Sequence, residues 1–181
     1  MIIIITGTPG CGKTTVSNML AKKIDAKLIS INYLLDNYDL NLGTDEVRGY
    51  KIVDVDKMIP IVDRIKDENP DKTIIFEGHL AQDYPHADKV IVLRCNPVEL
   101  EKRLNTRDWT DKKIHENIEA EILAICTQES YETYGDAVCE IDTTYNTPEE
   151  VADDILDIIN NQKEYSLGKI DYLEEYFYLL N

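Results

Sequence analysis

The sequence lacks any apolar run long enough to cross a bilayer. Its opening run, MIIII, is short, whereas a membrane-spanning helix needs about 20 apolar residues. No basic segment precedes that run, so a secretory signal peptide is not expected. At 181 residues with 43% hydrophobic positions, the chain has room for one real core. We therefore expect a single cytoplasmic domain over residues 1–181 and no membrane partner.

Cysteines are few, and none of them form close pairs in the sequence. The four are Cys11, Cys95, Cys126 and Cys139. Zinc and iron–sulfur sites usually draw on cysteines two to four residues apart. The scattered spacing favours reduced thiols in a cytosolic protein over a metal site or a disulfide framework.

Basic residues are also scarce relative to acidic ones. The chain has 19 Lys and Arg against 35 Asp and Glu, for a formal net charge of -16. Affinity for nucleic acid comes largely from Lys and Arg meeting phosphates, so general binding of RNA or DNA is not expected. A basic protein partner fits this charge, and a simply well-solvated acidic surface fits it too.

Short β-branched runs alternate with helical patterns along the chain, which predicts a parallel sheet covered by helices. The expected strands are Met1–Thr6, Lys27–Ile31, Thr73–Phe76, Lys89–Arg94 and Val138–Ile141. The expected helices are Lys13–Ile24, Asp56–Lys66, a helix capped by Asn96, one from Thr110 to about Tyr134, and Glu149–Asn160. The fold class is therefore α/β.

Two segments fall outside a minimal α/β core. Residues 32–53 are polar and rich in tyrosine, and they separate the second strand from the next helix. The tail 163–181 places Ile170, Leu173 and Phe177 at helical spacing, followed by Leu180. We expect the tail to fold back on the core through these residues, with an exposed partner-binding helix as the alternative.

The stretch GTPGCGKTT, residues 7–15, carries the strongest functional signal. Gly7, Gly12, Lys13 and Thr14 satisfy the pattern G-x-x-x-x-G-K-[ST], with a strand before it and a helix after it. Backbone N–H groups of such a loop surround phosphate oxygens, the lysine neutralises the β and γ phosphates, and the hydroxyl holds Mg²⁺. Cys11 lies inside the loop, where we interpret it as a neutral spacer that contributes its backbone.

A second candidate group, Glu77-Gly78-His79, follows the third expected strand. Ligands of open parallel sheets bind at the carboxyl ends of the strands, so this acid and this imidazole should lie beside the phosphates. Glu77 is suited to orienting Mg²⁺ or an attacking group. His79 is suited to orienting a water or sensing the γ phosphate, with a capping or packing role as the alternative.

A third group comes from the stretch RLNTRDW. Arg103 and Arg107 are four residues apart, which on a helix would place them on one face to grip a polyanion. The alternative is a solvated pair neutralised by Glu99 or Asp108. Trp109 either closes over a base or packs at the turn.

Together, GTPGCGKTT, EGH, VIVLRCNPVELEKRLNTRDW and KKIHENIEAEIL resemble the adenylate kinase isoenzyme 6 type, over residues 1 to about 160. These are small nucleoside monophosphate (NMP) kinases of archaea and eukaryotes that also act in ribosome assembly. The resemblance implies a P-loop NTPase fold, an NMP-kinase-like three-layer sandwich with a five-stranded parallel sheet. It also implies an inserted NMP-binding region at 32–53 and a short lid at 106–116.

The resemblance assigns roles to individual residues. It implies that ATP is contacted by Gly10, Cys11, Gly12, Lys13, Thr14, Thr15 and, from the lid, Arg107. From the residues themselves, as argued above, we expect Thr14 and Glu77 to hold Mg²⁺ and the catalytic set to be Lys13, Glu77, His79, Arg103 and Arg107. Ordinary adenylate kinases carry an AMP-gripping arginine just after the position of His79, and Arg48 is a candidate substitute. Asp108 stands where the family usually has glycine.

The implied activity is reversible phosphoryl transfer from Mg-ATP to AMP or another NMP, accompanied by ATP hydrolysis. The implied partner is the small-subunit ribosomal protein numbered eleven, bound transiently during late maturation of the small subunit and its rRNA. Two alternatives stay open: an ATPase assembly factor with incidental kinase activity, and a kinase of a small metabolite that is not a nucleotide.

Overall fold

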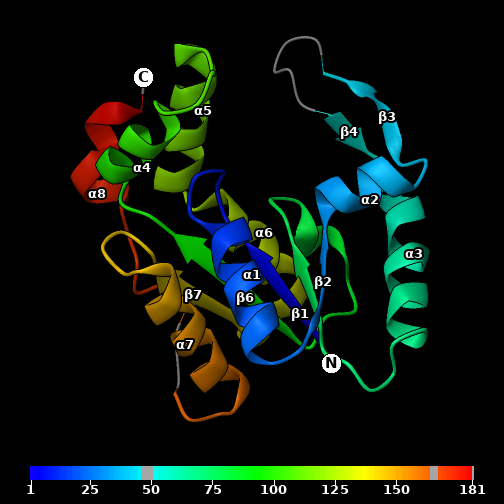
Figure 1. Cartoon of the computed structure of the whole chain (residues 1–181). Coiled ribbons are helices and arrows are strands. Elements are labelled where there is room, and N and C mark those ends of the chain that lie inside the picture. Colours follow the sequence, from blue (N-terminus) through cyan, green and yellow to red (C-terminus); the bar gives the residue numbers. More distant parts are fainter. Residues whose placement is uncertain (46–50, 164–166, 181) are drawn as a thin grey trace.

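The computed structural model describes residues 1–45, 51–163 and 167–180. Its centre is a parallel sheet of five strands in the order β2-β5-β1-β6-β7 (Figure 1). The strands are β1 (Ile2–Thr6), β2 (Lys27–Ser30), β5 (Ile74–Glu77), β6 (Lys89–Arg94) and β7 (Val138–Asp142). In β1, Ile4 is paired with Phe76 on one side and with Val90 on the other. This confirms the α/β fold class and the five-stranded parallel sheet expected from the sequence.

Helices flank the sheet and connect its strands. They are α1 (Lys13–Lys23), α2 (Ile31–Asn37), α3 (Val55–Asp67), α4 (Pro97–Leu104), α5 (Asp111–Ile122), α6 (Ile125–Tyr134), α7 (Pro148–Ile159) and the short α8 (Leu173–Tyr176). The Asn96 side chain accepts a hydrogen bond from the Val98 amide and caps α4, as expected. Thr147 and Glu150 form a capping box at the start of α7. Within the described ranges, no helix has the length and apolar character to span a membrane.

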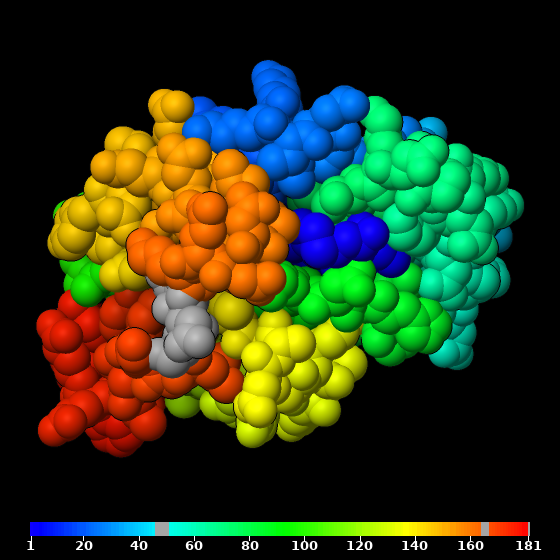
Figure 2. All heavy atoms as spheres, turned by 90° about the horizontal axis from the view of Figure 1, so that it is seen from below, coloured from blue at the N-terminus to red at the C-terminus, as the bar shows by residue number. Residues whose placement is uncertain are grey.

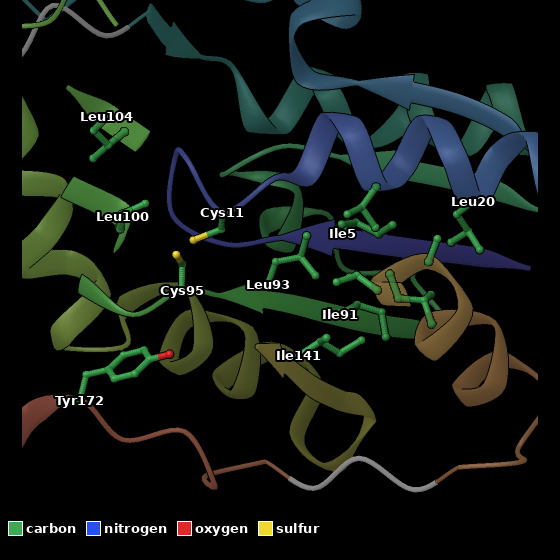
Figure 3. Packing of buried hydrophobic residues seen from close by; sticks show 14 of the residues in the cluster. Ile5, Cys11, Leu20, Ile91, Leu93, Cys95, Leu100, Leu104, Ile141 and Tyr172 are labelled. Carbon is green, nitrogen blue, oxygen red and sulfur yellow. The ribbon is translucent and has the colours of Figure 1, made fainter. Parts of the chain in front are cut away.

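The two faces of the sheet carry separate hydrophobic cores, which makes three layers. Side chains of neighbouring residues in a strand point to opposite faces, so Ile3 and Ile5 join one core and Ile2 and Ile4 the other. The first core packs against α1, α4, α5 and α7, and Figure 3 shows part of it. The second packs against α2 and α3. Because β1 is covered on both sides, its run of four isoleucines is fully buried.

The long helix expected from Thr110 to Tyr134 is wrong. Thr110 does cap a helix, by accepting a hydrogen bond from the Lys113 amide. That helix, α5, ends at Ile122, and Ala124 takes a left-handed conformation with φ of 52° before α6 begins. The break has a packing reason, because the isoleucines of α5 belong to the first core whereas α6 contributes Cys126 and Tyr134 to the second.

Residues between β2 and α3 form a small unit of their own beside the sheet. It consists of α2 and of two antiparallel strands, β3 (Asn41–Thr44) and β4 (Lys51–Val53). Figure 1 shows β3 and β4 standing above the carboxyl ends of the sheet, on the opposite side of the β1–α1 loop from α5. Arg48 lies outside the described residues.

The C-terminal tail folds back on the core, as expected, and two of the four predicted residues, Ile170 and Leu180, pack against the first core. The other contacts come from residues that the spacing did not suggest. Tyr172 and Tyr176 are 8% and 7% exposed in the first core, whereas Leu173 and Phe177 face solvent. The Asn96 amide donates to the Tyr176 hydroxyl at 2.6 Å. The α8 helix has only four residues, too few to sustain the longer apolar stripe that was expected. Seen from the end where β1 begins, the tail (red) lies at one edge of the molecule (Figure 2).

Candidate active site

The glycine-rich loop between β1 and α1 follows a path that only glycine allows. Gly7, Gly10 and Gly12 have φ values of 133°, 102° and 93°, a region that other residues rarely adopt. A Cβ at Gly7 would lie 2.3 Å from the Leu93 carbonyl oxygen, and one at Gly10 would lie 2.7 Å from Leu100 Cδ1. Gly12 caps α1 without a side chain, so the first amides of that helix remain open to an anion.

A cavity of about 450 Å³ opens in front of this loop. It is lined by Pro9, Gly10, Gly12, Lys13, Thr14, Thr15, Ile31, Asn32, Glu77, Gly78, His79, Arg107 and Trp109. The structure thus brings together the loop, the carboxyl end of β5, the start of α2 and the residues that precede α5. Of the residues predicted from the sequence, Cys11 and Arg103 are not in this lining.

Lys13 is the buried cation of the cavity. Its Nζ donates hydrogen bonds to the carbonyl oxygens of Gly7, at 2.6 Å, and Thr8, at 3.1 Å. Burial lowers the pKa of the Lys13 ammonium. A cation held in its own loop, beside open helix amides, gives the site a positive field for phosphate oxygens.

Thr14 and Glu77 meet beside Lys13. The Thr14 Oγ1 lies 3.4 and 3.5 Å from the two carboxylate oxygens of Glu77. Burial raises the pKa of Glu77, and Lys13 and the Thr14 hydroxyl oppose that rise. The described residues contain no cluster of three or more His, Cys, Asp or Glu that could hold a metal by itself. A hydroxyl and one carboxylate fit Mg²⁺, which is commonly bound by few protein oxygens together with substrate phosphates.

His79 follows Glu77 at the end of β5 and is mostly buried. Burial lowers its pKa to about 4, with further contributions from Lys13 and Lys113. The imidazole is therefore neutral at neutral pH. Its backbone is also fixed, because the Gln82 side chain donates to the His79 carbonyl at 2.9 Å and accepts from the Thr6 hydroxyl at 2.6 Å.

The expectation that Arg103 and Arg107 share a helix face is wrong. Helix α4 ends at Leu104, and Arg107 lies in the turn that follows. The Arg103 guanidinium donates to the carbonyl oxygens of Thr143 and Thr144, at 2.8 and 2.9 Å. It thereby supports the loop after β7, while Arg107 alone reaches the cavity wall.

Two cations lie over the ring of Trp109 at the rim of the cavity. The Arg107 guanidinium carbon is 4.9 Å from the ring centroid, and Lys113 Nζ is 4.4 Å from it. Such cation–π contacts restrict the long side chains of Arg107 and Lys113 to positions beside the cavity. Lys113 was not singled out in the sequence; it lies in the first turn of α5, and Trp109 directly precedes the residue that caps that helix.

Cys11 contributes its backbone, in line with the spacer interpretation. Its carbonyl oxygen accepts a hydrogen bond from the Thr143 hydroxyl at 3.0 Å. Burial raises the pKa of the Cys11 thiol, and Glu121 raises it further, so the reactive thiolate is disfavoured. In Figure 3 this side chain lies beside that of Cys95 within the first core.

Two buried charged residues behind the loop were missed. Glu121 accepts a hydrogen bond from the Thr8 hydroxyl at 2.5 Å and another from Arg94 Nε at 2.8 Å. Burial alone would lower the pKa of Arg94, but Glu121 and Glu140 raise it above its ordinary value. The sequence did carry a signal for them, because each is a charged residue at a position where burial is expected. Arg94 ends an apolar strand, and Glu121 falls on the apolar helix stripe of Ile114 and Ile118.

The chain is similar to a family model over part of its length and to known proteins along nearly its whole length. A family model described as an AAA domain matches residues 3–124. A "Putative adenylate kinase" of Methanocaldococcus jannaschii is 41% identical over 177 residues, covering 98% of this chain and 96% of that protein. A protein of the same description from Pyrococcus furiosus is 39% identical over 177 residues, covering 97% of this chain and 93% of its own length.

Solved structures share the fold at low identity. The thymidylate kinase of Candida albicans has a TM-score of 0.60 and 16% identity, covering 94% of this chain and 95% of that one. A deoxyadenosine kinase from M. mycoides has a TM-score of 0.57 and 20% identity, covering 89% of this chain and 100% of that one. At such identities the likeness is one of fold.

Proposed function

The chain belongs to the family of archaeal proteins described as "Putative adenylate kinase", and from this premise we propose that it is a nucleoside monophosphate kinase. It transfers the γ-phosphoryl group of Mg-ATP, reversibly, to AMP or another NMP. One observation carries the proposal: the glycine-rich loop shares its cavity with Ile31 and Asn32, the first residues of α2. A triphosphate on the loop therefore faces the small unit of α2, β3 and β4, where a second substrate can bind.

On the donor side, the loop amides and Lys13 bind the triphosphate. Gly10, Gly12 and Thr15 line the same wall, which supports their role in ATP binding. The proximity of Thr14 and Glu77 supports their role as the protein ligands of Mg²⁺. When bound, the metal neutralises charge on the phosphate oxygens.

On the acceptor side, residues 32–53 hold the monophosphate. On the opposite side of the loop, residues 106–116 form the lid. Figure 1 supports this division, because β3 and β4 stand on one side of the loop and α5 on the other. Arg107, held over Trp109 at the cavity rim, is the lid cation for the transferring phosphate. Arg103 acts indirectly. It donates a hydrogen bond to the carbonyl oxygen of Thr143, and the hydroxyl of Thr143 in turn donates to the Cys11 carbonyl in the phosphate-binding loop.

The chemistry is an in-line displacement. An oxygen of the acceptor phosphate forms a bond to the γ phosphorus as the bond from that phosphorus to the β–γ bridging oxygen breaks, giving ADP and a nucleoside diphosphate. The protein contributes position and positive charge and needs no covalent intermediate. Closing the cavity around both phosphates excludes water, which would otherwise accept the phosphoryl group.

The test is an assay of purified protein with Mg-ATP and a panel of nucleoside monophosphates, in which ADP and free phosphate are measured separately. We expect at least one monophosphate to accelerate ADP formation well beyond phosphate release. The proposal fails if no monophosphate changes the rate and all turnover appears as free phosphate.

A second function is favoured by the residues around the γ-phosphate position. Neutral His79 and the carboxylate of Glu77 are suited to orienting a water, and we propose that the protein also hydrolyses ATP. The family it resembles acts in small-subunit ribosome assembly, so we extend the proposal to transient binding of the ribosomal protein numbered eleven. The net charge of -16 supports a basic partner.

The variant His79→Ala tests the hydrolytic role. We expect it to slow ATP hydrolysis about tenfold or more, in the range of general acid–base effects, while phosphoryl transfer to AMP falls less. Equal losses in both reactions would remove the water-orienting role. Stimulation of hydrolysis by the purified ribosomal protein tests the partner, and no response would count against it.

A further inference from the structure

Thr8 is one of the points at which the phosphate-binding loop is tied to the protein behind it. Its carbonyl oxygen accepts hydrogen bonds from Lys13 Nζ at 3.1 Å and from the Cys11 amide at 3.2 Å. Its hydroxyl points away from the cavity and donates to Glu121 at 2.5 Å. Thr8 is only 2% exposed and does not line the cavity, so its side chain acts on the loop and not on a ligand.

Glu121 is a carboxylate with little freedom to move. It is 1% exposed. Its Oε1 accepts from Arg94 Nε at 2.8 Å and from the Cys95 amide at 3.0 Å. Its Oε2 accepts from the Thr8 hydroxyl and, at 3.9 Å, from the Cys11 thiol. A buried carboxylate must keep such partners, because losing one leaves a desolvated charge unpaired. The position of Oε2, and with it the Thr8 hydroxyl, is therefore fixed.

The C-terminal tail covers the far side of Arg94. The guanidinium lies 5.3 Å from the centroid of the Tyr172 ring, and its Nη1 donates to Glu140 at 2.5 Å. The tail also reaches Glu140 directly, because the Gly168 amide donates to its Oε2 at 2.8 Å. A continuous set of contacts thus runs from the tail through Arg94 and Glu121 to Thr8.

We propose that Glu121 is a positioning residue for the phosphate-binding loop and that the tail, through Arg94, keeps it in place. The proposal gives a role to the residues after α7. It rests on the proposed function only in that the task of the loop is to bind a nucleotide. Because α5 also carries Lys113, the same carboxylate ties the helix behind the cavity rim to the loop.

The loop itself can be tested without nucleotide, by amide hydrogen exchange at Cys11, whose amide donates to Thr8. Thr8→Val removes the hydroxyl at constant shape, and Glu121→Gln removes the charge. We expect both to accelerate exchange at Cys11 about tenfold, the effect of losing one hydrogen bond to a charged group. Thr8→Ser keeps the hydroxyl, and Glu119→Gln changes a partly exposed carboxylate on the same helix, so both should stay near the wild-type rate.

Nucleotide binding gives a second readout, because Trp109 is the single tryptophan and lines the cavity. Its fluorescence follows titration with ADP. We expect Thr8→Val and Glu121→Gln each to weaken ADP binding about tenfold. The double variant should bind ADP as tightly as the weaker-binding of the two single variants, because both substitutions remove the same hydrogen bond. Tyr172→Leu, which removes the ring over Arg94, should shift both readouts in the same direction, whereas Tyr172→Phe should not.

The outcomes separate the two claims. Unchanged exchange at Cys11 in Thr8→Val and Glu121→Gln overturns the inference, and Thr8→Val decides alone if Glu121→Gln does not fold. Faster exchange that extends equally to the amides of α7 shows global destabilisation and also overturns it. Faster exchange confined to the loop, with no ADP binding by the wild type, supports the positioning role and removes the proposed function instead. If Tyr172→Leu leaves both the exchange rate at Cys11 and the affinity for ADP at their wild-type values, the role assigned to the tail is overturned.

Discussion

Lys13 shows at the scale of one residue how the loop keeps a cation in a buried place. Its ammonium lies on the carbonyl oxygens of Gly7 and Thr8, and burial lowers its pKa. A phosphate offers such a group stronger, charged acceptors than two neutral carbonyls. Binding energy is therefore available where the β and γ phosphates are expected.

Replacing this cation should abolish turnover. We expect Lys13→Met to lower kcat/KM for Mg-ATP at least about a hundredfold, in both phosphoryl transfer and hydrolysis, since a charge-stabilising donor is lost. Lys22→Met, on the exposed side of the same helix, is the matched control and should match the wild type. Retained turnover in Lys13→Met would contradict the assignment of the loop.

His79 makes stability depend on pH. Its pKa is about 4 in the folded protein and about 6.5 in an unfolded chain. Between these values the unfolded chain takes up a proton that the folded protein does not, so stability falls as pH is lowered from about 6.5 to about 4. For this group alone the loss near pH 5 should be about 1 to 2 kcal/mol.

Urea unfolding of the wild type and of His79→Gln at pH 7 and pH 5 measures that effect. Other groups titrate in both proteins, so the difference between them isolates the imidazole. We expect the wild type to lose more stability on acidification than His79→Gln does. Equal losses would show that His79 takes up its proton in the folded state as easily as in the unfolded one.

The residues that could be predicted from the sequence are those whose chemistry depends on local order along the chain. Gly7, Gly12 and Lys13 follow from one motif, and Glu77 follows from its place at a strand end. Glu121 could not be found in this way, because its partners Thr8 and Arg94 lie 113 and 27 residues away in the chain. Such a network exists only once the sheet and α5 have packed.

At the scale of elements, the tail shows why burial cannot be read from spacing alone. Leu173 and Phe177 have the expected helical spacing and are yet exposed, while Tyr172 and Tyr176 pack in the first core. The tyrosines carry polar groups, and this favours them at the edge of the core, where the Tyr176 hydroxyl meets Asn96.

Substitutions in the tail should reflect this arrangement. We expect Tyr172→Leu to lower the free energy of unfolding by about 1 to 3 kcal/mol, because it removes packing and the cation–π contact with Arg94. Phe177→Leu, at a side chain that is 67% exposed, should stay within about 0.5 kcal/mol of the wild type. Denaturant unfolding measures both, and the opposite order would contradict the observed packing.

Element boundaries were predictable where a cap marks them and not where packing ends a helix. Asn96, Thr110 and Thr147 each begin a helix as expected, because the capping hydrogen bond is local. The left-handed turn at Ala124 could not be predicted, because glycine is the residue that usually marks such a turn and this position has alanine. It follows from the need of α5 and α6 to serve different cores, which is a property of the tertiary structure.

At the scale of the whole molecule, the parallel sheet explains why the candidate residues meet. The loop after β1 and the Glu77–His79 pair after β5 lie at the same carboxyl edge, since β1 and β5 are parallel neighbours. The units that follow β2 and β6 rise on either side of this edge (Figure 1). One cavity therefore lies between two parts of the chain, and this is where we propose that a triphosphate and an acceptor meet.

The central claim is that the γ-phosphoryl group passes to a nucleoside monophosphate, and the fate of that group tests it most directly. Purified protein is mixed with Mg²⁺, AMP and ATP labelled at the γ phosphate, and the label is followed into nucleotide and into free phosphate. The account predicts that most of the label appears in ADP formed from AMP, and that Lys13→Met forms none. Label found only in free phosphate, whichever monophosphate is supplied, would contradict it.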